Sequence, residues 1–232
     1  MSEIAAKFVS NGRQRRPPPD PINGVLSFGY SMLAHRCTAA CRLARVLVYV
    51  RSPDDVAHIA EAIEKKLGVG GATRIARLTG TIRGKERDEL AENEVFRAFK
   101  IGSDRSSPLH HALYLISTSA GEVGVDLDAD DLVCDLTTLD SMAQRFGRVN
   151  RLGGKGRSAT ITVVAEPIGD KVPLKAQVEE TAKLLRSLPD VDGGLDASPA
   201  ALSALLATPE AQAAFSPVPT ILPATDILFD QW

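Results

Sequence analysis

A short, continuously apolar run at residues 45–50 is followed at once by the residues that begin a helix. Branched apolar residues without polar alternation predict a strand that is covered on both faces. Ser52 then supplies an N-cap, Pro53 suits the first helical turn, and apolar residues recur at helical spacing as far as residue 67. These residues therefore predict a strand, a tight turn and an amphipathic helix, which is the unit from which parallel sheets are built.

The same alternation continues as far as residue 165. Further strands are predicted at residues 74–78, 111–116, 132–136 and 159–165. Helical segments are predicted between them at residues 85–100, 119–124 and 140–149. We expect an α/β fold, a parallel sheet flanked by helices, with ligands at the carboxyl ends of the strands.

The pattern weakens after Pro167. Helices are predicted at residues 174–188 and 199–206, and a proline-rich tail without a clear period follows. The last residues, 229–232, lack the polar composition usual at a terminus, so we expect this helical and irregular C-terminal extension to be truncated. The predicted division is therefore residues 1–44, 45–166 and 167–232.

Composition indicates a folded protein without a membrane segment. Apolar residues make up 44% of the 232, which suits an ordinary core, and no apolar run approaches the roughly 18 residues that span a bilayer. Residues 1–45 carry seven Lys and Arg against two Asp and Glu, although the net charge of the chain is only −2. Three cysteines without zinc-site spacing, and no apolar core of a signal peptide, predict a reducing cytoplasm.

Two arginines, Arg148 and Arg151, are three residues apart in the predicted helix near residues 140–149. Residues three apart share a helix face, so both guanidinium groups are expected to reach one anion. Arginine stays charged and binds phosphate oxygens with a fork of donors. The spacing predicts a sensor of nucleotide phosphate; the alternative is a solvated basic helix end that stops at Gly153 and Gly154.

A second polar segment, residues 117–126, follows the strand predicted to end at residue 116. Hydroxyls and glycines at a strand-to-helix turn expose backbone N–H groups and the positive helix end, which together suit a phosphate. The alternative is a tight turn that needs small residues. Asp126 is an acid among apolar residues, and it would accept from a ribose hydroxyl, an arginine or a backbone amide.

Four motifs, in this order and spacing, resemble the second RecA-like domain of superfamily 2 helicases. They are the strand at 45–50 with its capped helix, Leu78-Thr79-Gly80, the turn at 118–126 and the segment at 144–151. More narrowly, residues 121–128, 139–141 and 144–151 are similar to the helicase-nuclease that degrades target DNA in type I CRISPR systems. The resemblance covers about residues 45–232, and it implies an ATP-dependent helicase that moves along single-stranded DNA.

The resemblance also implies roles for particular residues. Two arginine fingers would reach the γ-phosphate of ATP: Arg148 and Arg151. Three residues would lie beside the nucleotide: Gly124, Asp126 and Gln144. Three hydroxyl side chains would contact the sugar-phosphate backbone of single-stranded DNA without reading its sequence: Ser52, Thr79 and Thr118.

Half of the expected ATP site is missing from the sequence. No Walker A loop, no Asp-Glu-x-His or Asp-Glu-x-Asp segment and no HD-type nuclease motif occurs. The adjacent His110 and His111 point to opposite faces of a strand, so no metal site is predicted. We expect ATP and Mg²⁺ to be shared with a first RecA-like domain that this sequence lacks, and no cofactor to act on this chain alone. The expected partners are single-stranded DNA and a separate first RecA-like/HD nuclease chain or a CRISPR effector complex.

Residues 11–30 instead resemble the CRISPR integrase, a metal-dependent endonuclease that inserts spacers; the alternative is a basic, proline-rich linker leading into a helix at 21–44. The integrase metal site requires a Glu upstream and a His and an acid downstream, and only Glu3 precedes the stretch, so no catalytic residue is assigned. Three hypotheses remain: a helicase module that is inactive alone, an integrase-related nuclease, and an inert remnant of a gene fusion.

Overall fold

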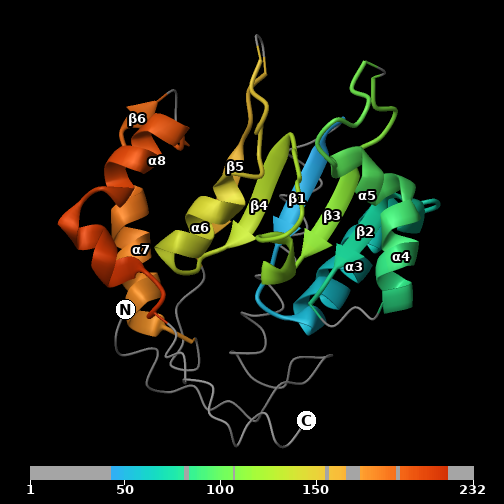
Figure 1. Cartoon of the computed structure of the whole chain (residues 1–232). Coiled ribbons are helices and arrows are strands. Elements are labelled where there is room, and N and C mark those ends of the chain that lie inside the picture. Colours follow the sequence, from blue (N-terminus) through green and yellow to red (C-terminus); the bar gives the residue numbers. More distant parts are fainter. Residues whose placement is uncertain are drawn as a thin grey trace, which may run out of the picture.

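The core of the protein is a five-stranded parallel sheet with the strand order β2-β3-β1-β4-β5 (Figure 1). The computed structural model describes residues 43–80, 84–106, 108–154, 157–165, 173–191 and 194–218. The strands are β1 Arg45–Tyr49, β2 Ile75–Leu78, β3 Leu113–Ser117, β4 Asp131–Asp135 and β5 Ile161–Val164. Every neighbouring pair is parallel, so the α/β prediction is confirmed, and β1 lies in the middle with β3 and β4 on either side.

Helix α3, Pro53–Leu67, covers one face of the sheet. Ser52 caps it by accepting a hydrogen bond from the backbone N–H of Asp55 at 3.2 Å. The apolar face of the helix packs against alternate residues of β1, Val46 and Val48, which are fully buried. The predicted helix at 53–67 is confirmed because its cap, its proline and its apolar spacing are all local features.

The other face of the sheet, which carries Leu47 and Tyr49 of β1, is covered by α5, Glu94–Phe99, and α6, Leu139–Phe146. Helix α4, Gly84–Glu92, precedes α5. The prediction of one helix over residues 85–100 is wrong. Asn93 has extended backbone and accepts a hydrogen bond from the N–H of Phe96 at 3.0 Å, which begins a second helix.

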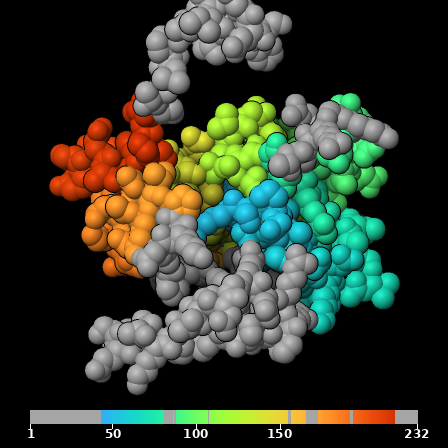
Figure 2. Space-filling model, turned by 90° about the horizontal axis from the view of Figure 1, so that it is seen from below, coloured from blue at the N-terminus to red at the C-terminus, as the bar shows by residue number. Residues whose placement is uncertain are grey.

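The C-terminal helices gather beside the β5 edge of the sheet, where Figure 2 shows them as the orange and red part of the surface. They are α7, Lys175–Arg186, and α8, Pro199–Leu206, joined by a short antiparallel hairpin, β6 Asp190–Val191 and β7 Gly194–Leu195. A 3₁₀ segment, η3 Pro209–Ala214, packs on α7 and α6. Both predicted helices are confirmed, whereas the hairpin was not predicted.

The described residues hold no helix that is both long and apolar enough to cross a bilayer. Residues 21–42 of the helix predicted at 21–44, with Cys37 and Cys41, and the tail beyond residue 218 lie outside the residues that the structure describes, and the described residues 43 and 44 form a bend before β1.

Candidate functional site

The turn after β3 packs tightly against the central strand. A short 3₁₀ segment, η2 Ser119–Gly121, begins there, and a side chain on Gly121 would place its Cβ 2.5 Å from the hydroxyl of Ser117. The hydroxyl of Tyr49 donates to the carbonyl of Gly121 at 2.6 Å. Burial raises the pKa of this phenol, with the Glu122 carboxylate adding to the effect. The turn therefore needs glycine because Tyr49 and Ser117 already fill the space.

A buried ion cluster, Arg145 with Glu122 and Asp135, links this turn to α6 and to the end of β4. Arg145 donates to Glu122 Oε1 at 2.7 Å and to Asp135 Oδ1 at 2.6 Å. Its guanidinium also lies 5.0 Å from the centre of the Tyr49 ring, and Ser141 donates to Glu122 Oε2 at 2.7 Å. Burial raises the pKa of Asp135, although the two arginines that face it, Arg145 and Arg51, oppose that rise.

Sequence reasoning missed both Glu122 and Arg145. Arg145 is three positions after Met142 and next to Phe146, and all three are buried on the inward face of α6. A charged residue at an inward-facing helix position implies a buried partner, because burying an unpaired charge is costly. The inward-facing position of Arg145 in the sequence pattern of the helix therefore indicated an internal ion pair.

The helix that was predicted to carry Arg148 and Arg151 on one face ends before both of them. Helix α6 stops at Phe146, and Gly147 is its C-cap. The chain then turns through Asn150 at φ 45°, and it pairs with Ala129, whose N–H donates to the carbonyl of Arg148 at 2.8 Å. The helical placement is therefore wrong, because pairing with the segment before β4 pulls the chain out of the helix.

The two arginines nevertheless converge on one carboxylate. Nη1 of Arg151 lies 3.0 Å from Oδ1 of Asp126, and Nη1 of Arg148 lies 3.5 Å from the same oxygen. The Arg148 guanidinium also donates to the backbone carbonyl of Glu122. Asp126 is 75% exposed, so the carboxylate that joins the arginines faces solvent. The geometry supplies two fixed cationic groups around a single exposed oxygen.

Gly124 and Gln144 lie on the two segments that approach this arginine pair. Gly124 has φ 80°, a left-handed conformation that favours glycine, and it turns the chain between Glu122 and Asp126. Gln144 is exposed on α6, one helical turn before Arg148, and within the described chain its side chain has no hydrogen-bond partner. Gly124 and Asp126 thus belong to the loop that holds the arginines, while Gln144 is exposed on the helix that precedes them.

Ser52, Thr79 and Thr118 each follow the carboxyl end of a strand, β1, β2 and β3 respectively. Since these parallel strands are neighbours in the order β2-β3-β1, the three residues form a row along the edge of the sheet where the carboxyl ends of the strands lie. Two of the hydroxyls already have internal roles. Ser52 caps α3, and Thr118 is only 6% exposed and accepts from the N–H of Ala120 at the start of η2.

A second arginine cluster surrounds Asp128 and Asp130 just before β4. Asp128 is fully buried, and Arg157 donates to both of its carboxylate oxygens at 3.0 and 3.2 Å. Arg105 pairs with Asp128 at 3.2 Å and with Asp130 at 2.6 Å. Asp128 also accepts from the backbone N–H of Arg151 at 2.9 Å, so this cluster holds the chain next to the exposed arginine pair.

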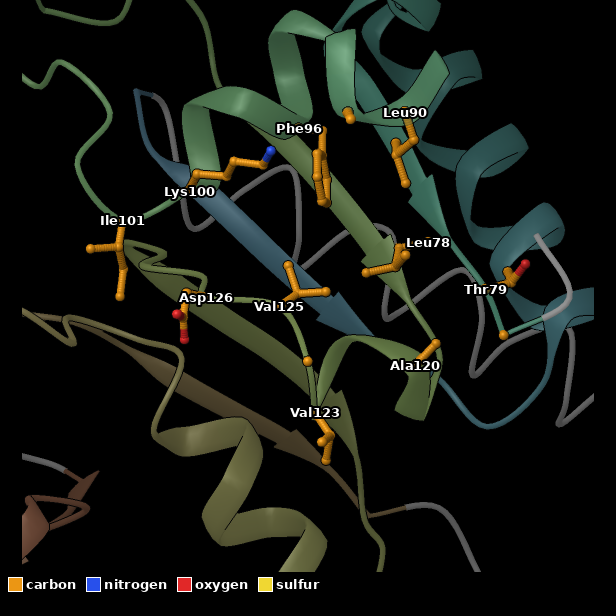
Figure 3. A pocket seen from close by; sticks show the side chains of 13 residues that line it. Leu78, Thr79, Leu90, Phe96, Lys100, Ile101, Ala120, Val123, Val125 and Asp126 are labelled. Carbon is orange, nitrogen blue, oxygen red and sulfur yellow. The ribbon is translucent and has the colours of Figure 1, made fainter. Parts of the chain in front are cut away.

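A cleft of about 590 Å³ opens between the α4–α5 pair and the loop at residues 123–126 (Figure 3). Leu90, Phe96 and Lys100 lie along one side, and Val123 and Val125 lie along the other. One end is formed by Thr79, Gly80 and Ala120, and the other by Ile101 and Asp126. The cleft thus runs from the carboxyl ends of β2 and β3 towards the carboxylate that holds the arginines.

Clusters of three or more His, Cys, Asp or Glu side chains that suit a metal ion are absent from the residues with a described structure. Cys134 is buried and unpaired, and burial raises its pKa to about 12.

Residues 42–153 match the family model of the CRISPR-associated nuclease/helicase Cas3, C-terminal. This part of the chain is a Cas3-like C-terminal helicase domain. Residues 2–50 match the model of CRISPR associated protein Cas1, so a Cas1-like segment precedes the Cas3-like domain and overlaps it at β1.

Two curated relatives, both CRISPR-associated endonucleases, match a short part of the chain. The chain is 56% identical over 34 residues to "CRISPR-associated endonuclease Cas1 2" of Rhodospirillum rubrum, covering 15% of this chain and 10% of that protein. It is 43% identical over 44 residues to "CRISPR-associated endonuclease Cas1 1" of Thermus thermophilus, covering 19% of this chain and 14% of that protein. The matched part is thus a small fragment of those proteins.

Solved structures share the fold of the Cas3-like domain. The crystal structure of T. fusca Cas3 matches with a TM-score of 0.61 at 21% identity, over 76% of this chain and 21% of that one. The T. fusca Cas3-ADP structure matches with a TM-score of 0.60 at 18% identity, over 76% of this chain and 22% of that one. The chain therefore spans about a fifth of these Cas3 structures, and the likeness establishes a RecA-like fold.

Proposed function

We propose that this CRISPR-associated helicase module acts as the second RecA-like half of an ATP-dependent DNA helicase. Its activity requires a first RecA-like domain on another chain, because the Walker A and Walker B motifs do not occur in this sequence. The carrying observation is the convergence of Arg148 and Arg151 on the exposed Asp126 carboxylate.

A phosphate oxygen and a carboxylate oxygen make the same kind of bond to a guanidinium. The two arginines already hold one anionic oxygen at 3.0 and 3.5 Å. Exposed ion pairs of this kind are worth only about 0–1 kcal/mol, so a γ-phosphate that arrives on a partner domain displaces Asp126 at little cost. Arg148 and Arg151 would then stabilise charge on the transferring phosphoryl group.

Gly124, Asp126 and Gln144 would lie on the nucleotide side of the same site. The displaced Asp126 carboxylate is suited to accept from a ribose hydroxyl, and the exposed amide of Gln144 is suited to support the nucleotide. The structures of T. fusca Cas3-ADP and T. fusca Cas3-ATP share this fold, which supports ATP as the ligand. Mg²⁺ would be held by the first RecA-like domain.

Single-stranded DNA would lie along the row formed by Thr79, Thr118 and Ser52. Backbone contacts at such an edge position a strand without reading its sequence. Thr79 is the hydroxyl side chain of the row that lines the open cleft, whereas Thr118 is buried and would contribute mainly by shaping η2. Since the chain carries a net charge of −2, we expect weak binding that falls as salt rises.

The natural partner would be a separate chain with a first RecA-like domain and HD nuclease, or a CRISPR effector complex. A solved structure titled "CRISPR RNA-guided surveillance complex, pre-nicking" shares the fold with a TM-score of 0.51, which supports the second possibility. The cytoplasm stays our prediction for where these partners meet.

The test is to mix this chain with a separately produced first RecA-like domain and to measure ATPase activity with and without single-stranded DNA. We expect Mg²⁺-dependent, DNA-stimulated activity in the mixture and none from this chain alone. Arg148→Ala should abolish it, while Arg97→Ala, at an arginine that is 62% exposed on α5, should not. Activity from this chain alone, or full activity of Arg148→Ala in the mixture, would contradict the proposal.

The match of residues 2–50 to Cas1 supports a second candidate, an integrase-related nuclease. A cleavage assay with Mn²⁺ or Mg²⁺ decides between the two, and we expect no cleavage because the segment provides no complete set of metal ligands. If the chain shows neither cleavage nor activity in the mixture, an inert remnant of a gene fusion is the remaining explanation.

A further inference from the structure

The cleft beside the candidate DNA edge has two apolar walls that face each other. Leu90 and Phe96 form one wall and Val125 lies opposite them, while Val123 lies at the end of the cleft with its side chain directed away from Leu90 and Phe96, as Figure 3 shows. Its volume of about 590 Å³ lies inside the range of roughly 300–1,000 Å³ that is typical of small-molecule sites. Val123 is 69% exposed, so the mouth of the cleft presents an uncovered apolar side chain.

We propose that this cleft binds an unstacked base of the single-stranded DNA whose backbone passes Thr79. The inference rests on the proposed function, because it requires a strand along that edge, and it adds a base pocket to backbone contacts. The aromatic ring of Phe96 and the aliphatic side chains around it would accept any base by its face, which gives affinity without sequence preference.

The position of the cleft favours a base of the strand over other ligands. Thr79 and Gly80, at the end of β2, belong both to the edge of the sheet and to the lining of the cleft. A strand whose backbone contacts Thr79 therefore has the cleft mouth directly beside its bases. The edge that would hold the strand and the mouth of the cleft are continuous, so a base could enter the cleft without a rearrangement of the described chain.

Charge at the rim of the cleft also fits a nucleotide of a strand. The ammonium group of Lys100 lies 5.4 Å from the centre of the Phe96 ring, on the rim of the apolar wall. A base inside the cleft would leave its neighbouring phosphate outside, where Lys100 can approach it. Asp126, at the same end, faces the arginine pair through its carboxylate.

The experiment compares the affinity of the full chain for two strands of equal length, oligothymidylate and a fully abasic deoxyribose-phosphate strand. We expect the unmodified chain to bind oligothymidylate about tenfold more tightly, within the range found for base stacking. Val125→Asp should remove this preference and leave binding of the abasic strand unchanged. Val69→Asp adds the same charge at a fully exposed valine outside the cleft and should keep the preference.

The abasic strand separates loss of the base contact from simple repulsion of phosphate, because repulsion would weaken both strands alike. Equal affinity for both strands would overturn the base pocket while leaving the backbone proposal intact. Absence of binding to either strand would overturn both proposals. If adenosine displaces oligothymidylate from the unmodified chain and from Val125→Asp alike, the base contact lies elsewhere and the inference fails.

Discussion

Two arginine clusters in this protein have the same chemistry, guanidinium groups bound to a carboxylate, but different roles. Around Asp128, which is 1% exposed, Arg105 and Arg157 saturate both carboxylate oxygens. Around Asp126, which is 75% exposed, Arg148 and Arg151 share a single oxygen. The first cluster is complete in itself, whereas the second leaves guanidinium donors that a ligand can take up.

The difference shows how burial separates a structural ion pair from a binding site. A buried carboxylate without its partners is strongly penalised, so the Asp128 cluster must stay closed for the chain to fold. An exposed pair gains little from staying closed, so the Asp126 pair can exchange its anion. Because Asp128 also accepts from the backbone of Arg151, the closed cluster positions the open one.

The largest expected effect is that a substitution in the exposed cluster lowers activity, whereas a substitution in the buried cluster lowers stability. Arg148→Ala should lower the DNA-stimulated ATPase rate of the mixture by about 10³-fold or more, as for arginine fingers in comparable enzymes. Arg157→Ala should lower the free energy of unfolding instead, because it leaves Asp128 buried with fewer partners. Steady-state ATPase assays and urea unfolding of both variants test this; equal losses of activity and stability in both would contradict the comparison.

The next effect concerns the two carboxylates. Asp128→Asn should lower the free energy of unfolding by about 3–5 kcal/mol, since one member of a buried ion cluster is removed. Asp126→Asn should change it by less than about 1 kcal/mol because that pair is exposed. Urea unfolding followed by circular dichroism measures both, and a larger loss from Asp126→Asn would reverse the assignment of the clusters.

A smaller effect is expected at Asn150, which turns the chain between Arg148 and Arg151. Its φ of 45° is left-handed, and such a conformation costs most residues roughly 1–2 kcal/mol. Asn150→Ala should therefore destabilise the chain by about that amount, whereas Asn150→Gly should be close to neutral. The Oδ1 atom of Asn150 is buried without a hydrogen-bond partner in the described chain, and Nδ2 donates to the carbonyl of Arg157 at 3.5 Å, a contact that both variants lose alike. Equal unfolding midpoints for the two variants would argue against a conformational role.

The smallest effect is a dependence of stability on pH. Burial of Asp130 opposes its charge, but hydrogen bonds from the Arg45 N–H and the Arg105 guanidinium outweigh that and hold its pKa below the usual range. The resulting stability is present above the unfolded pKa of about 3.9 and is lost as pH falls through the lower folded pKa. Asp130→Asn should thus show a weaker fall in unfolding midpoint below about pH 4 than the unmodified chain.

The sheet and α3 could be predicted because their determinants are local. Each strand is a short apolar run, and Ser52, Pro53 and the apolar repeat define α3 within a single segment. The break at Asn93 was also locally encoded, as an N-cap followed by Glu94, but the helical periodicity on both sides concealed it.

The geometry of the site could be predicted only in part. The meeting of Arg148 and Arg151 was predicted from helical spacing, yet they meet through the turn at Asn150 and through Asp126, 22 residues before Arg148. The cluster around Asp128 draws on segments around Arg45, Arg105 and Arg157, which only the folded sheet brings together. No local pattern encodes contacts of that range.

The strand that the Cas1-like segment overlaps, β1, is the central strand of the sheet. β1 is the first described strand, yet its neighbours β3 and β4 are made only once residues 113–135 have been synthesised. Residues 2–44 of the Cas1-like segment precede the amino end of this innermost strand, while Ser52, Thr79 and Thr118 follow the opposite ends of the strands. The amino end of β1 and the row that would hold DNA thus lie at opposite ends of the sheet.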